Sequence, residues 1–235
     1  MTTNKIDLKN RPASIVNLIG GRLCLDFINS IGARQTGPLG ETVIRDEKLN
    51  DYLDLLAWAR HAGALDESET RILVKEAVQH PSEVARVFRL ALRLREALYP
   101  VFKGVVKGEP ASEHNISVLN EELQLASAAR QIKATASGFE WTWSTSRRAF
   151  EKILWLISDS AAELLTSGDL SRLRQCGGDD CGWIFEDTTR NRSRHWCDMR
   201  DCGNRDRVRR FRQREKTKSV PNRVTSRNIR KKTVG

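Results

Sequence analysis

Residues 176–202 read CGGDDCGWIFEDTTRNRSRHWCDMRDC, with four cysteines in this one short segment. They form two pairs, Cys176-x4-Cys181 and Cys197-x4-Cys202, and fifteen residues separate the pairs. Two thiolate pairs joined by a segment of hairpin length can close a tetrahedral Zn²⁺ site. The chain continues at once into the basic run GNRDRVRRFR at 203–212. The pattern therefore predicts a zinc-bound knuckle that leads into a basic helix.

The predicted site is closed. Four thiolates leave no coordination position for water, so the metal is expected to be structural rather than catalytic. Disulfides and unliganded thiols are the alternatives, and metal is favoured because thiols stay reduced in the cytosol. His195 could replace one ligand, but we expect it to be a surface side chain. Cys24, which lies among apolar residues, is expected to be a small buried side chain.

Charge is distributed unevenly along the chain. Residues 171–235 carry 19 Lys and Arg against 8 Asp and Glu, whereas the remainder carries 21 against 22. A nearly neutral body with a strongly basic C-terminal part predicts contact with a polyanion. The alternative is a basic part that only keeps the chain soluble.

The N-terminal residues carry no convincing secretory signal, because Met1–Pro12 is polar and no cleavage site stands out. No run of about 18 apolar residues occurs, so no membrane span is expected. We therefore expect a cytoplasmic protein without a membrane partner.

Apolar residues at helical spacing predict most of the chain before the cysteines. Helices are expected over 47–61 and 66–79, from Pro81 onward with a kink or an end at Pro100, after a Ser112 cap, and over 146–166. Residues 131–134 and 139–143 flank Ser137-Gly138 and predict a β-hairpin. Residues 15–31 could form a strand or a helix, and residues 32–43 are expected to be a loop.

The expected fold is therefore mainly α. A helical N-terminal domain with one β-hairpin covers residues 15–168. A small four-Cys zinc-finger module, made of knuckle, β-hairpin and basic helix, covers 172–216. Residues 217–235 are polar and basic without periodicity, and are expected to be a disordered tail.

The cysteine module resembles the CGNR zinc finger. The resemblance covers CGWIF at 181–185, DTTRNRSRHWC at 187–197, and the tetrapeptide CGNR at 202–205. Glu186 and Asp206-Arg207 depart from the family's usual residues. The resemblance implies a finger that binds zinc and DNA.

The body resembles the ABATE domain, which usually precedes a CGNR finger. The matching stretches are GGRLCLDFINS at 20–30, YLDLLAW at 52–58, LREALY at 94–99 and AAELLTSGDL at 161–170. The resemblance implies a bacterial, stress-related transcriptional regulator whose helical domain senses a ligand.

Arginines near the cysteines are the candidate nucleic-acid contacts. A helix over 204–215 would place Arg205, Arg209 and Arg212 on one face, with Val208 and Phe211 docked on the knuckle. Arginine suits bidentate contact with phosphates or guanine edges. The predicted contacts with DNA, RNA not being excluded, are Arg190, Arg192, Arg194, Arg205, Arg207, Arg209, Arg210 and Arg212.

Four polar residues of the body lie in or beside apolar segments, namely Arg22, Asp26, Asn29 and Arg95. If they are buried they need partners. They are candidate ligand-binding residues, and the alternative is a buried structural network. The body could also mediate a homodimer.

The favoured function is a DNA-binding transcriptional regulator, not an enzyme, and no catalytic residues are assigned. In the alternative, the body holds an active site and the finger is structural or binds RNA. His61, His80 and His114 are scattered without the spacing of a catalytic set.

Overall fold

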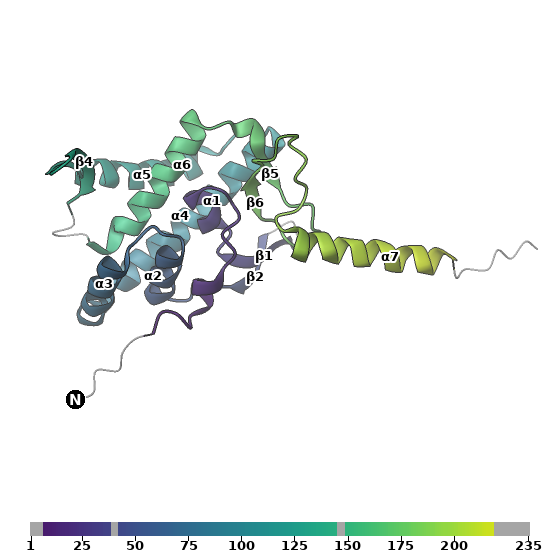
Figure 1. Ribbon diagram of the computed structural model, residues 1–235, viewed down its shortest axis with the longest axis horizontal. Helices are drawn as coiled ribbons and strands as arrows, with labels where there is room; N and C mark the ends of the chain where they lie inside the picture. The colour runs from purple at the N-terminus through teal and green to yellow at the C-terminus, as the bar shows by residue number, and fades with distance from the viewer. Residues whose placement is uncertain (1–6, 39–41, 145–148, 219–235) are drawn as a thin grey trace, which may run out of the picture.

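A computed structural model describes residues 7–38, 42–144 and 149–218 of the chain. The fold is mainly α, as predicted, and these residues form three two-stranded antiparallel sheets (Figure 1). The helices are η1 Pro12–Ile15, α1 Leu23–Ile28, α2 Tyr52–His61, α3 Glu67–Gln79, α4 Pro81–Lys107, α5 Glu113–Ala129, η2 Ala149–Glu151, α6 Lys152–Ser167, η3 Leu170–Arg172, η4 Met199–Gly203 and α7 Asn204–Lys218. The strands are β1 Ile31–Thr36, β2 Thr42–Glu47, β3 Arg130–Thr135, β4 Gly138–Trp143, β5 Leu173–Gln175 and β6 Ile184–Glu186.

Local signals placed the starts of α3 and α5 correctly. The helix expected from residue 47 begins only at Tyr52, because Glu47 ends β2 and Asp51 caps α2, and the helix expected from residue 146 becomes α-helical at Lys152. Asp66 caps α3 in a full capping box with Glu69, and the Ser112 hydroxyl accepts from the backbone N–H of Asn115 at the start of α5. Of the two outcomes expected at Pro100, a kink or an end, the end does not occur, because α4 runs on to Lys107. Leu98 and Phe102 on either side of Pro100 are buried, so packing outweighs the lost backbone hydrogen bond.

Helix α4 is the centre of the body. It contacts α1, α2, α3, α5, α6 and also β5 of the cysteine module. Its buried face carries Ala91, Leu94 and Leu98, all without solvent exposure. Cys24 is buried in the same core as predicted, and burial raises the pKa of its thiol to about 12. No helix among the described residues is long and apolar enough to cross a membrane.

The body holds a hairpin that the sequence did not predict. Strands β1 and β2 pair antiparallel where a loop was expected over 32–43. Gly32 allows this pairing, because a Cβ there would lie 2.6 Å from the Cβ of Asp46. The two strands lack the alternating apolar pattern that predicts a hairpin from sequence. Contacts with the cysteine module help to hold β1 in place instead.

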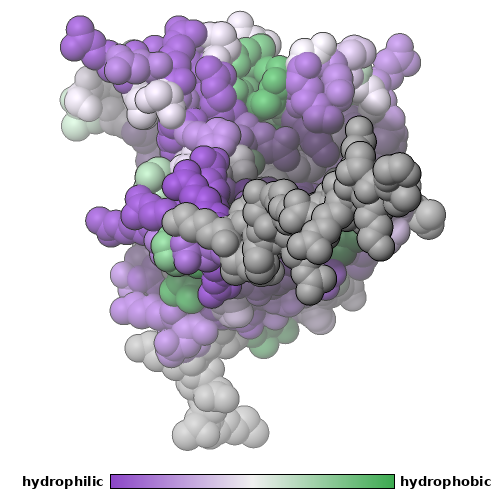
Figure 2. All heavy atoms as spheres, turned by 90° about the vertical axis from the view of Figure 1, so that its right-hand side faces the viewer, coloured by the Kyte–Doolittle hydropathy of each residue, from purple (hydrophilic) through white to green (hydrophobic). Residues whose placement is uncertain are grey.

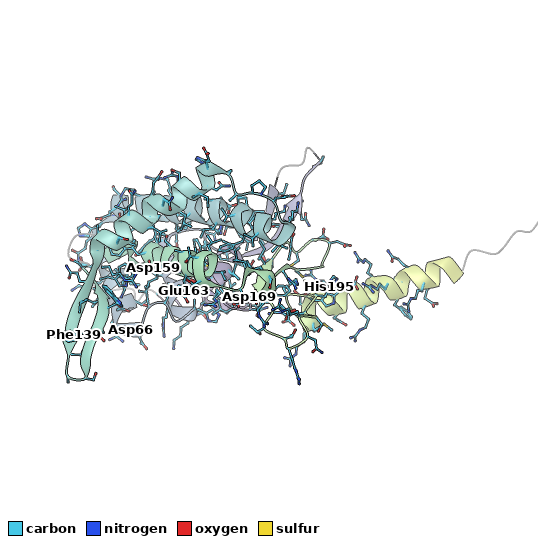
Figure 3. The ribbon with its side chains drawn as sticks, turned by 90° about the horizontal axis from the view of Figure 1, so that it is seen from above. Asp66, Phe139, Asp159, Glu163, Asp169 and His195 are labelled. Atoms are coloured by element: carbon cyan, nitrogen blue, oxygen red, sulfur yellow. The ribbon has the colours of Figure 1, made fainter. Side chains whose placement is uncertain are left out.

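The predicted hairpin is present as β3 and β4, paired from Arg130↔Trp143 to Thr135↔Gly138. It projects from the body, with Phe139 near its far end (Figure 3). Ile132, Phe139 and Trp141 are all exposed there.

The β-hairpin expected in the cysteine module is present as β5 and β6. Strand β6 lies between the two cysteine pairs and pairs with β5, which precedes the first cysteine, in the register Leu173↔Glu186 to Gln175↔Ile184. The predicted tail 217–235 falls largely on residues 219–235, which lie outside the described residues, whereas Thr217 and Lys218 end α7.

Candidate metal centre and nucleic-acid interface

The four cysteines converge on one point. The sulfur atoms of Cys176, Cys181, Cys197 and Cys202 all lie within 4.8 Å of one another, and all four residues are buried. Two of the separations are 3.6 Å, from Cys181 to Cys197, and 3.5 Å, from Cys197 to Cys202. Zinc–sulfur bonds of about 2.3 Å in a tetrahedron place sulfurs about 3.8 Å apart, so the cluster fits Zn²⁺.

Backbone groups orient the sulfurs. The N–H of Gly178 and the N–H of Cys197 both point at the Cys176 sulfur, at 3.4 and 3.3 Å. Gly182, at φ +72°, takes a left-handed conformation directly after Cys181. These contacts preform the knuckle around a negatively charged sulfur.

His195 packs beside the metal cluster rather than joining it. The cluster of candidate ligands contains four Cys and no His among the described residues. A Cβ at Gly177 would lie 2.3 Å from the His195 Nε2 atom, so the ring covers the glycine. Its other neighbour is Trp196, with ring centroids 4.3 Å apart. Figure 3 places His195 at the base of α7.

The cysteine module is built into the body. The Trp183 indole N–H donates to the Ile31 carbonyl at 3.0 Å, and the Arg34 N–H donates to the Cys181 carbonyl at 2.9 Å. The Tyr99 hydroxyl donates to the Gly182 carbonyl at 3.0 Å. All four cysteines belong to the same hydrophobic core as α4. The metal-binding cysteines and the body therefore share one hydrophobic core.

Two of the four predicted ligand-binding residues contact the module. Arg22 forms an ion pair with Glu186 at 2.9 Å. Asn29 exchanges two hydrogen bonds with the backbone of Ile184. Both residues thus connect the first helix of the body to β6.

The other two predicted residues have partners inside the body. The Asp26 carboxylate accepts from the Gly20 N–H at 2.8 Å, and burial raises its pKa to about 6. Arg95, almost fully buried, donates to both Glu47 oxygens at 2.7 and 2.5 Å and to Glu96 at 2.9 Å. The structure therefore does not bring the four residues to one shared site, and their contacts are those of a structural network.

Helix α7 carries most of the predicted nucleic-acid contacts away from the body (Figure 1). Its side chains Arg205, Arg207, Arg209, Arg210 and Arg212 are all exposed. Seen from the α7 end, the visible surface is mostly hydrophilic (Figure 2). Phe211 is 65% exposed and Val208 is 41% exposed, so the prediction that they dock on the knuckle was wrong for this arrangement. Because the helix projects outward, Val208 and Phe211 do not pack against the body.

Carboxylates neutralise three of these arginines. Asp206 pairs with Arg209 and with Arg210, each at 2.6 Å, and Arg209 also contacts Asp179. Arg205 pairs with Asp201 at 3.1 Å and also donates to the Cys202 sulfur. Within the described part of the chain, Arg207, Arg212 and Arg214 form no ion pair.

The turn arginines differ in their availability. Arg190 is exposed, and Arg192 pairs with Asp169 at 3.1 Å. The prediction that Arg194 is free to contact nucleic acid was wrong. Its guanidinium donates to the carbonyls of Ile19 and Cys197 at 3.0 and 2.6 Å and stacks on Phe185. A phosphate would have to displace these contacts.

Asp187 holds the turn that carries these arginines in place. Its buried carboxylate accepts from the backbone and hydroxyl of Thr189 and from the backbone of Arg194. Burial opposes ionisation, but these hydrogen bonds outweigh it and lower the pKa of Asp187.

Arg200 is an exposed cation in the second knuckle that was not among the predicted nucleic-acid contacts, although its position between Cys197 and Cys202 could have identified it.

The fold and the four-sulfur centre define a zinc-finger protein whose finger is attached to a helical body. Comparison with protein families confirms both parts. Residues 21–168 match the ABATE family, described as "Putative stress-induced transcription regulator", and residues 172–215 match the CGNR zinc finger. The chain belongs to the ABATE family, and zinc is its cofactor. No curated protein matches the chain significantly.

Proposed function

We propose that this protein is a transcriptional regulator in which the zinc finger binds DNA and the helical body senses a small molecule. The family descriptions support a regulator with a zinc finger. The zinc ligands in this proposal are Cys176, Cys181, Cys197 and Cys202, whose sulfurs form the cluster described above.

The observation that carries the proposal is the placement of α7. The helix begins two residues after Cys202 and projects from the body (Figure 1). An α-helix is about 10–12 Å across, which matches a major groove about 12 Å wide. Because the metal cluster fixes the start of the helix, zinc sets its direction relative to the body.

The arginines divide into two groups in this proposal. Arg207 and Arg212, which form no ion pair among the described residues, contact phosphates first. Arg209 and Arg210 must leave Asp206 before they can contact DNA. The exchange of Asp206 for a phosphate or a guanine edge costs part of the gain, and this cost favours the sites that offer the best contacts.

The enzyme alternative receives no support from the histidines. Among the residues that the structure describes, the one His–carboxylate contact is His80 with Glu76 at 3.8 Å, and both side chains are substantially exposed. His61 contacts the Val16 carbonyl instead. A homodimer and a cytoplasmic location remain predictions.

The test is binding of the zinc-loaded protein to random double-stranded DNA and to single-stranded RNA across a salt series. A triple variant, Arg207→Ala, Arg212→Ala and Arg214→Ala, removes three α7 charges. A matched variant, Arg71→Ala, Lys75→Ala and Arg89→Ala, removes the same charge from exposed positions of α3 and α4.

We expect DNA binding that weakens with salt, and a slope that falls by up to about 3 units in the α7 variant but is unchanged in the matched variant. Preference for RNA over DNA would replace the partner in this proposal. No binding to either, with zinc present, would refute it.

A further inference from the structure

A small hollow of about 110 Å³ lies where the first knuckle meets the body. The body contributes β1 and α4, and the module contributes β5 and the knuckle backbone. The lining residues are Arg34, Gln35, Tyr99, Lys103, Gln175, Gly178, Asp179 and Gly182. None of these residues was predicted to bind a ligand, and they come from three separate segments of the chain, 34–35, 99–103 and 175–182.

The hollow holds a buried cation with an unused donor. Arg34 is 5% exposed and donates from its two Nη atoms to Glu96 at 2.5 and 3.0 Å. Its guanidinium lies over the Tyr99 ring, 4.1 Å from the centroid. The Nε atom is buried without a hydrogen-bond partner. An unpaired buried N–H is costly, so a shift of the side chain that brings this N–H to an acceptor in the hollow would be stabilising.

Lys103 adds a second positive charge to the hollow. Its ammonium nitrogen is 5.8 Å from the Tyr99 ring centroid, and it forms no ion pair in the part of the chain that the structure describes. The acidic groups nearby are already engaged. Glu96 is shared by Arg34 and Arg95, and Asp179 contacts Arg209. The hollow therefore offers unpaired donors and no free carboxylate.

We propose that this hollow binds a small anion of the carboxylate or phosphate type, held by the Lys103 ammonium beside the positive charge of the Arg34 guanidinium, whose buried Nε–H becomes available when the side chain shifts toward the anion. A cavity of about 150 Å³ holds a benzene-sized molecule, so the ligand has only a few heavy atoms. A charge-assisted hydrogen bond from Lys103, together with the neighbouring charge of Arg34, accounts for the preference for an anion.

The walls of the hollow connect it to the metal centre and to α7. Arg34 bonds through its backbone to Cys181, and Tyr99 bonds to Gly182. Asp179 lines the hollow and contacts Arg209 of α7. A bound anion repels the Asp179 carboxylate and favours the contact of Asp179 with Arg209. Asp179 then competes with DNA phosphates for Arg209. This part of the inference rests on the proposed function, and it makes the anion an effector that lowers DNA affinity, by about fivefold.

The first test is calorimetric titration of the zinc-loaded full chain with sodium phosphate and with sodium acetate, at an ionic strength held constant with sodium chloride. We expect saturable binding at one site for at least one of the two anions. Lys103→Gln should weaken it by about tenfold, because one charge-assisted hydrogen bond is lost. Lys75→Gln, which removes an exposed charge on α3, should leave it unchanged. Lys103→Arg should retain binding, which separates loss of charge from misfolding.

Absence of saturable binding above the chloride background, or equal affinity of the Lys103→Gln and Lys75→Gln variants, would overturn the proposal. A second arm measures DNA binding with and without the better anion. If Lys103→Gln weakens DNA binding while no free anion binds, a DNA phosphate occupies the hollow and the effector proposal fails. Failure of the protein to bind DNA leaves the titration readable, so the two proposals fail separately.

Discussion

The side-chain amide of Asn29 acts as a strand partner for Ile184. Its Nδ2 donates to the Ile184 carbonyl at 2.8 Å, and its Oδ1 accepts from the Ile184 N–H at 3.1 Å. Both residues are buried, Asn29 directly after α1 and Ile184 at the start of β6. A residue of the body thus completes the hydrogen bonding of the zinc-finger hairpin. The finger and the body are expected to unfold together because of it.

Asn29→Ala should therefore lower the free energy of unfolding by about 2–4 kcal/mol, because it leaves two buried backbone groups unpaired. Urea denaturation followed by tryptophan fluorescence measures this, and a single transition is expected. Asn120→Ala, at an exposed position of α5, is the control and should change stability by about 0.5 kcal/mol or less. Equal effects of the two variants would mean that the Asn29 contact contributes nothing.

Removal of zinc should loosen part of the body as well as the finger. The cysteines lie in the same core as α4, and β1 bonds to Cys181. We expect chelation to raise amide hydrogen exchange in the finger, in α1 and in β1, while α3 and α5, which pack mainly against other helices of the body, stay protected. Unchanged exchange in α1 and β1 after zinc loss would show that the finger is energetically separate.

Regular features of the fold could be predicted from sequence, and contacts between distant segments could not. Asp66 and Ser112 marked helix starts because capping is local. The pairing of β1 with β2 depends on Gly32 and on a hydrogen bond to Cys181, about 150 residues away. Glu186, a departure from the family pattern, has its partner in Arg22. No local pattern announces such an ion pair.

The site was predictable to a similar degree. The cysteine spacing identified all four members of the sulfur cluster, because each pair is a local turn. The number of arginines could be read from the sequence, but their availability could not, because Asp179, Asp201 and Asp206 determine which of those on α7 are neutralised. Arg194 looked like a phosphate contact until its carbonyl partners were located.

Arg207→Ala and Arg194→Ala should separate binding from stability. Arg207 is exposed and forms no ion pair with a described residue, so its loss should weaken DNA binding about three- to tenfold and lower the salt slope by about 1 unit, with stability unchanged. Arg194 bonds to backbone carbonyls, so its loss should cost about 1–3 kcal/mol of unfolding free energy. Fluorescence anisotropy across a salt series and urea denaturation measure the two effects. The reverse pattern would exchange their roles.

Glu122 on α5 should make the protein less stable as pH rises toward neutrality. The pKa of its carboxyl group is raised to about 7, mainly by burial; the nearby carboxylates of Glu151 and Glu121 add to this shift, and Arg93 and Arg86 oppose it. Below pH 4.5 both folded and unfolded states hold the proton, and the stabilisation is complete. As pH rises from about 4.5 through 7, the unfolded state releases the proton first, so stability falls.

Glu122→Gln cannot ionise, so it should gain about 1–3 kcal/mol relative to the unmodified protein between pH 5 and pH 8. Urea denaturation at the two pH values measures the gain. Glu121→Gln is the matched control, because it changes the adjacent, half-exposed carboxylate, which pairs with Arg93 at 2.7 Å. Losing that pair should cost a little stability at pH 8 rather than add any. If Glu122→Gln shows no pH-dependent gain in unfolding free energy, the Glu122 carboxyl group ionises with its ordinary pKa, and burial at this position does not hold its proton.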